Sequence, residues 1–151
     1  RECSACHGVD GRGQANLFPN LLDVDWQWGG SPEQLEQTLR GGRNANMPAW
    51  EAIIGEENTV AVANYLLEFD NREHAGRAVY EQSCAACHGV DGAGNVFLGA
   101  PNLADNTWLY GGDLDTILVT LREGRQGKMP AFDERRLDPA QLKLIIAKLA
   151  R

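Results

Sequence analysis

One short motif occurs twice in this chain and constrains its fold more than any other feature. The four cysteines of the 151-residue sequence all lie in two copies of Cys-x-x-Cys-His, at 3–7 and 84–88. On a helical turn the second cysteine and the histidine share the face of the first cysteine, so all three reach one flat group. This spacing is the attachment signature of a c-type haem. The motif residues are Cys3, Cys6, His7, Cys84, Cys87 and His88.

Two other uses of paired cysteines fit this pattern less well. A disulfide redox site needs neither the adjacent histidine nor a second copy of the motif. Structural zinc sites seldom place a histidine directly after the second cysteine. The sequence therefore predicts two covalently bound haems c, with iron, as the cofactors.

The two motifs open a longer internal repeat. The segment 3–11 returns at 84–92, and after one inserted residue the repeat continues at an offset of 82 positions. The segments that return at this offset are 19–21, 26–30, 39–43 and 47–50. Because each copy holds one motif, we expect two domains, 1–70 and 71–151, joined by the polar residues 70–72.

Helical periodicity and helix start and stop signals predict an all-α fold. No stretch shows the sustained alternation of a β-strand. No apolar run approaches the ~20 residues that a membrane-spanning helix needs. The first repeat has two residues before its motif, whereas the second has a lead-in helix. The helices that we expect lie at 31–41, 56–69, 73–83, 113–124 and 138–150.

Each repeat also holds one methionine at a matching position. Met47 and Met129 are the two methionines of the chain, and each precedes a proline. A following proline keeps the methionine extended and out of a helix. Such a loop can present a thioether sulfur to iron as the second axial ligand, and filling of the core is the alternative. His74 lies in the linker without a counterpart, so we interpret it as a surface residue.

Further candidates for cofactor contacts occur in pairs at matching positions. A ligating imidazole normally donates its other N–H to an acceptor, and a proline carbonyl after each motif is a plausible one. An aromatic ring in each repeat can pack on a haem edge or belong to an ordinary core. An arginine in each repeat can pair with a propionate or lie solvated at a helix end. These residues are Pro19, Pro101, Trp28, Tyr110, Arg43 and Arg125.

The net charge of −7 is uneven along the sequence. Residues 1–70 hold 11 acidic residues and 4 arginines, whereas residues 71–151 hold 10 of each sign. No basic patch is present, so nucleic-acid binding is excluded. We expect a basic redox partner to meet the first repeat, because such a field steers oppositely charged proteins. The alternative is a solvated acidic face without a partner.

The chain resembles class I cytochrome c domains over its whole length, and more closely the di-haem subunit of cbb₃-type cytochrome c oxidases. The segments that carry the closer resemblance are 100–103, 108–112 and 129–132, supported by 18–21, 26–30 and 47–50. The resemblance implies two tandem class I cytochrome c domains, each around one covalent haem. It also implies the axial pairs His7 with Met47 and His88 with Met129.

The same resemblance implies a periplasmic electron carrier that serves as the electron-entry subunit of the oxidase. Its partners would be a donor cytochrome and the catalytic subunit, and it would have no catalytic site of its own. The family subunit is held by an N-terminal membrane helix, which this sequence does not contain. The alternatives are a soluble c₄-type shuttle, an electron-transfer module of another periplasmic oxidoreductase, and a di-haem peroxidase. Paired His and Met ligands leave no open iron position, which favours electron transfer over peroxidase chemistry.

Overall fold

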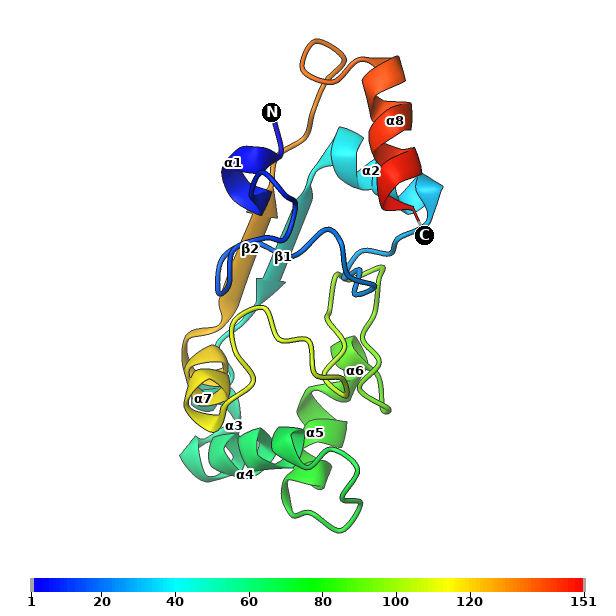
Figure 1. Ribbon diagram of the computed structural model, residues 1–151. Helices are drawn as coiled ribbons and strands as arrows, with labels where there is room; N and C mark the ends of the chain where they lie inside the picture. Colours follow the sequence, from blue (N-terminus) through cyan, green and yellow to red (C-terminus); the bar gives the residue numbers. More distant parts are fainter. Residues whose placement is uncertain (1, 151) are drawn as a thin grey trace.

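The computed structural model describes residues 2–150 as two helical lobes at the ends of a two-stranded ladder (Figure 1). We call them the upper lobe (residues 2–42 and 130–150) and the lower lobe (residues 48–124), after their places in Figure 1. The upper lobe contains α1 (Ser4–His7), α2 (Pro32–Gly41) and α8 (Pro139–Leu149). The lower lobe contains α3 (Glu51–Ile54), α4 (Glu56–Leu67), α5 (Gly76–Ser83), α6 (Ala85–His88) and α7 (Leu114–Glu123).

The ladder joins the methionine segments of the two repeats. Strand β1 (Arg43–Met47) runs antiparallel to β2 (Arg125–Met129), with Arg43 opposite Met129 and Met47 opposite Arg125. The expectation of a purely α-helical chain is therefore wrong at this point. Both strands are short and mostly polar, and their paired residues lie 78 to 86 positions apart in the sequence, so no local alternation indicated them.

The helices predicted at 31–41, 113–124 and 138–150 begin and end within one residue of the prediction, whereas α4 ends two residues earlier than predicted and α5 begins three residues later. The Ser31 side chain accepts a hydrogen bond from the backbone of Gln34, whose side chain caps Ser31 in return. Asp113 caps α7 in the same way through the backbone N–H of Thr116, although without the reciprocal bond. At the other end, Gly42 and Gly124 stop α2 and α7 with φ angles of 67° and 72°. Glycine adopts this conformation more readily than other residues. Because each repeat has a glycine at this position, the two helices end at equivalent residues.

The two repeats exchange their C-terminal halves between the lobes. Helix α2 of the first repeat packs on α8 of the second, and α4 of the first packs on α5 and α7 of the second. Equivalent backbone bonds close the two exchanges: Phe132 N–H donates to the Leu39 carbonyl (2.9 Å), and Trp50 N–H donates to the Leu121 carbonyl (2.7 Å). Each lobe is therefore built from both sequence segments, 1–70 and 71–151.

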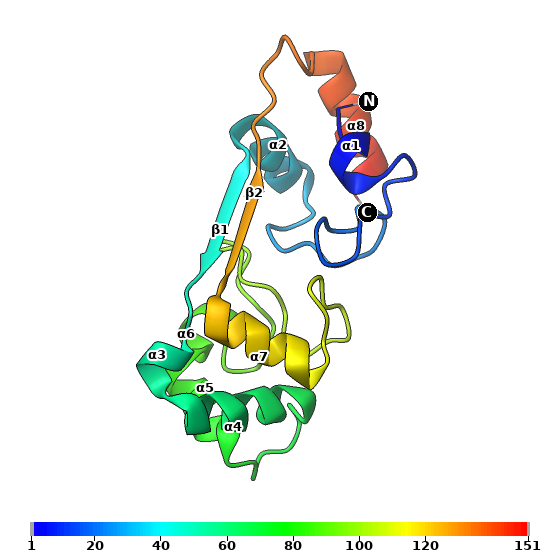
Figure 2. The same cartoon turned by 90° about the vertical axis from the view of Figure 1, so that its left-hand side faces the viewer.

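The lower lobe has the larger apolar core. Figure 2 shows α7 beside α4, and the buried residues between these helices and α5 form one cluster. Its members are Val62, Ala63, Tyr65, Leu66, Tyr80, Cys84, Ile117 and Leu121. The upper cluster is smaller and consists of Leu39, Phe132, Leu137 and Leu142.

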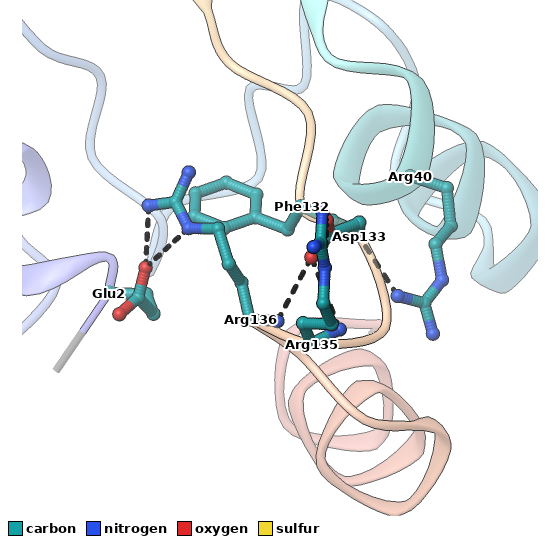
Figure 3. Close-up of polar contacts among 6 residues, drawn as sticks. All are labelled: Glu2, Arg40, Phe132, Asp133, Arg135 and Arg136. Carbon is teal, nitrogen blue, oxygen red and sulfur yellow. Dashed lines mark hydrogen bonds and ion pairs between the residues drawn. The ribbon is translucent and has the colours of Figure 1, made fainter.

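Polar contacts reinforce the exchange in the upper lobe (Figure 3). The Arg40 guanidinium on α2 donates to the backbone carbonyls of Phe132 (3.1 Å) and Leu137 (2.8 Å). The Arg136 guanidinium stacks 4.7 Å from the Phe132 ring centroid and pairs with the Glu2 carboxylate at 2.6 Å. These bonds tie the last third of the chain to its first helices. Within residues 2–150, no helix is long and apolar enough to cross a membrane.

Candidate haem sites

The two motif histidines are held in matching positions on the short helices α1 and α6. The exposed fractions of His7 and His88 are 8% and 7%. The Nδ1 atom of His7 lies 2.9 Å from the Pro19 carbonyl oxygen, and that of His88 lies 2.9 Å from the Pro101 carbonyl oxygen. A carbonyl only accepts, so Nδ1 carries the proton in both rings. No group of the described chain hydrogen-bonds to either Nε2, which leaves that lone pair free for a metal.

The chain segment between each histidine and its proline forms a tight loop. The N–H of Gly13 donates to the His7 carbonyl, and that of Gly94 donates to the His88 carbonyl, both at 2.8 Å. Gly94 has a φ of 83°, and a Cβ there would lie 2.6 Å from the Ala100 carbonyl oxygen. Glycine is therefore required at this crossing. The loop fixes the proline carbonyl against the imidazole and so fixes the orientation of the ring.

The thiols beside the histidines are free, as covalent attachment of a haem requires. All four cysteines are free of disulfides. No group of three or more His, Cys, Asp or Glu side chains within residues 2–150 is arranged to hold a metal ion. Burial raises the pKa of the Cys84 thiol to about 11 and lowers the pKa of His88. The imidazole is therefore neutral near pH 7, which is the form that binds a metal.

The methionines lie in the lobe opposite to that expected from the repeat. Met47, at the end of β1, packs against the lower cluster that contains Cys84. Met129, at the end of β2, packs against the upper cluster around Leu39. The structure therefore brings Met47 to the lobe of His88 and Met129 to the lobe of His7. This differs from the expected pairs, because the ladder carries each methionine across to the other repeat (Figure 1).

The paired arginines and aromatic residues stay within their own repeats. The Arg43 guanidinium lies 4.7 Å from the Trp28 ring centroid, and its Nε donates to Thr38 Oγ1 at 2.8 Å. At the equivalent place, Arg125 lies 4.5 Å from the Tyr110 centroid and donates to Thr120 Oγ1 at 2.9 Å. Each arginine is the first residue of its strand and pairs with the methionine that ends the other strand. Each end of the ladder thus combines the arginine and aromatic ring of one repeat with the methionine of the other.

Comparison with known proteins identifies the family. The family model for cytochrome c oxidase, cbb3-type, subunit III matches residues 1–66 and 71–147. The chain belongs to this family. Among curated relatives, the cbb3-type cytochrome c oxidase subunit FixP of Bradyrhizobium sp. (strain ORS 278) is 41% identical over 93% of this chain and 54% of its own length. The subunit CcoP of Azospirillum brasilense is 37% identical over 93% of this chain and 55% of its own length.

Membership of the cbb3-type subunit III family confirms the resemblance to a subunit of cbb₃-type oxidases. The chain spans about half the length of the curated relatives that it matches. Covalent haem c is the cofactor that a cytochrome c family implies. The free thiols and the buried imidazoles with their free Nε2 atoms are the groups that this cofactor needs.

The exchange between repeats also changes where the charge lies in this family member. The upper lobe holds 9 acidic and 6 basic residues, a net charge of −3. The lower lobe holds 12 acidic and 3 basic residues, a net charge of −9, and the ladder adds +3. Several acidic residues of the first repeat, such as Glu56 and Glu57, lie on α4 in the lower lobe. In space the stronger negative field therefore surrounds His88 and not His7.

Proposed function

We propose that this chain carries single electrons as the electron-entry module of a cbb₃-type cytochrome c oxidase, through two covalently bound haems c. One observation carries the proposal. In each lobe a buried histidine keeps a free Nε2 beside two free thiols, and a methionine arrives from the other repeat. The names of the relatives, all subunits of cbb₃-type oxidases, support the assignment of the complex.

The residues have distinct roles in this proposal. Bound haem c supplies a one-electron couple at its iron. His88, oriented by the Pro101 carbonyl, and Met47 would hold the iron of one haem. In the upper lobe, His7, oriented by the Pro19 carbonyl, and Met129 would hold the iron of the other haem. A thioether ligand favours the reduced iron, so the methionines would raise both potentials.

Saturated ligation explains why the proposed activity is electron transfer. With an imidazole and a thioether on each iron, no position is open for a substrate, so electrons would move without bond formation. The partners would be a donor cytochrome and the catalytic subunit of the oxidase. A periplasmic location follows for this function, because the donor and the attachment of haem to Cys-x-x-Cys-His both lie outside the cytoplasm.

The experiment that tests the function begins with the mass of the chain produced in a periplasm equipped for haem attachment. The denatured protein should weigh as much as the polypeptide plus two haems, and Cys84→Ala with Cys87→Ala should remove one. The reduced protein should not bind carbon monoxide, because both irons are saturated. One haem or none would contradict the two-haem proposal, and rapid carbon monoxide binding would favour a ligand-binding or peroxidase role.

A further inference from the structure

The most exposed apolar segment of the lower lobe is a loop tip that the proposed ligands do not use. Val96, Phe97 and Leu98 are consecutive, and their exposed fractions are 37%, 88% and 54%. An isolated exposed apolar side chain is ordinary, but three in succession at one tip form a patch. The equivalent loop of the first repeat has three residues instead of four between its bridge residues, and it presents only Leu17 in this way.

This tip is rigidly attached to the candidate iron ligand. The loop begins at Gly94, whose N–H donates to the His88 carbonyl, and it ends at Pro101, whose carbonyl accepts from His88 Nδ1. Asn95 closes the loop by pairing with Ala100. A partner seated on the tip would therefore stand close to the lower redox site.

The upper lobe clamps the base of the same loop. The Gln27 side chain donates a hydrogen bond to the Gly99 carbonyl. Gly99 has a φ of 65°, and a Cβ there would lie 2.1 Å from the Trp28 ring. The base is thus fixed by the neighbouring lobe while the tip stays open to solvent. A preordered apolar tip loses little conformational entropy when a partner covers it.

The charge around the tip indicates the kind of partner. Residues 92–104 contain no charged side chain, and Asp91 and Asp105 flank them. The lower lobe as a whole carries −9. An uncharged apolar centre inside a negative field is complementary to an apolar patch with a basic rim. A bilayer surface with anionic lipids fits less well, since no Lys or Arg lies in the loop to attract it.

We propose that the 96–98 tip is the docking contact for a basic redox protein that exchanges electrons with the lower site through an apolar patch. The proposal rests on the proposed electron-transfer function and names the partner of that same site. It predicts that the two features affect different rates. The charge of the acidic lobe should set the association rate and its salt dependence, whereas the apolar tip should set the dissociation rate of the complex.

The test uses the holoprotein with both haems and mitochondrial cytochrome c as the basic probe. Binding is measured by calorimetry, and electron transfer by stopped flow, from 20 to 500 mM salt. F97S combined with L98S should weaken binding about tenfold, mainly through faster dissociation, with an unchanged salt slope. Asp91→Asn with Asp105→Asn, which keeps the turn acceptors, should instead slow association and flatten the slope.

The matched control is Leu17→Ser, at the equivalent tip of the upper lobe, which should change affinity less than twofold. Equal affinities of the tip variant and the wild type, or an equal loss in Leu17→Ser, would overturn the docking proposal. Flotation of the wild type, but not the tip variant, with phosphatidylcholine–phosphatidylglycerol vesicles would also overturn it and assign the tip to a membrane. The haem content and midpoint potentials of each variant separate these outcomes from failure of the proposed function, which would appear already in the wild type.

Discussion

The two lobes derive from the same sequence repeat, yet they are packed differently. In the lower lobe α4 crosses α5 so closely that a Cβ on Gly76 would lie 2.0 Å from the Ala61 carbonyl oxygen. Tyr80 and Val62 at this crossing are fully buried. In the upper lobe, Leu144 is 72% exposed; it is the sixth residue of α8, as Ala61 is the sixth residue of α4. Within the described residues, α5 therefore covers a face of α4, whereas the corresponding face of α8 is exposed.

This comparison also separates local from exchanged structure. The histidine loops, helix caps and arginine–aromatic stacks form within each repeat. The cores and methionine positions depend on the partner repeat instead. We therefore expect perturbations of the lower crossing to be severe and perturbations of surface pairs to be mild.

The largest effect is expected from Gly76→Val at the α4–α5 crossing. Its side chain would overlap the Ala61 backbone, which cannot move without opening the lower core, so the free energy of unfolding should fall by about 3 kcal/mol or more. Amide hydrogen exchange should show the loss in α4 and α5 and little change in α2 and α8. The matched control is Gly41→Ala at the end of α2, where a Cβ meets nothing within 4 Å. Equal loss of protection in both lobes would contradict the comparison.

A smaller effect is expected from removal of one buried hydroxyl in the lower lobe. Tyr80 Oη donates to the Gly89 carbonyl at 2.6 Å, so Tyr80→Phe should cost about 1–2 kcal/mol in chemical denaturation. Burial raises the pKa of Tyr80, so the unfolded chain loses this proton first and stability should fall above about pH 10. The variant should lack that decline. Tyr65→Phe is the control, and a cost equal to that of Tyr80→Phe would contradict the role of the bond.

Acid should weaken the cap of α7. The bonds from Thr116 lower the pKa of Asp113, so this carboxylate stabilises the fold above its ordinary pKa near 3.8 and loses that effect as pH falls further. Hydrogen exchange of α7 should therefore quicken below pH 4. Asp113→Ser keeps a cap that does not titrate, as Ser31 provides for α2, and should remove this pH dependence. An unchanged acid response in Asp113→Ser would show that other carboxylates cause it.

The smallest effect is expected at the ion pair between Arg136 and Glu2. Both side chains are about half exposed, so Glu2→Gln should lower the free energy of unfolding by about 0.5 kcal/mol or less. High salt should produce a similar loss in the wild type and none in the variant. A loss above about 1 kcal/mol would mean that this pair, and not the Phe132 core, closes the upper lobe.

Local chemistry made much of this molecule predictable. The spacing in 3–7 and 84–88 predicted the motif helices, and caps such as Ser31 and Asp138 predicted where helices begin. The proline carbonyls accept from the histidines in both repeats, although the second loop is one residue longer, because a glycine N–H closes each loop on the histidine carbonyl.

The exchange could not be predicted, and the reason is physical. Met47 and Met129 follow equivalent helices and precede equivalent prolines. The local sequence therefore does not indicate in which lobe each methionine lies. The lobe in which each methionine lies depends on strand pairing between residues 78 to 86 positions apart, in segments with no strand alternation. The lobe charges of −3 and −9 depend on the same strand pairing, so the sequence alone did not predict them either.

The measurement that tests the exchange most directly is nuclear Overhauser spectroscopy of the reduced holoprotein. The ε-methyl resonance of Met47 is assigned by its loss in Met47→Leu. The account predicts contacts between this methyl group and protons of the porphyrin bonded to Cys84 and Cys87, with Met129 contacting the porphyrin bonded to Cys3 and Cys6. Contacts from Met47 to the Cys3 and Cys6 porphyrin would contradict the exchange and restore pairing within each repeat.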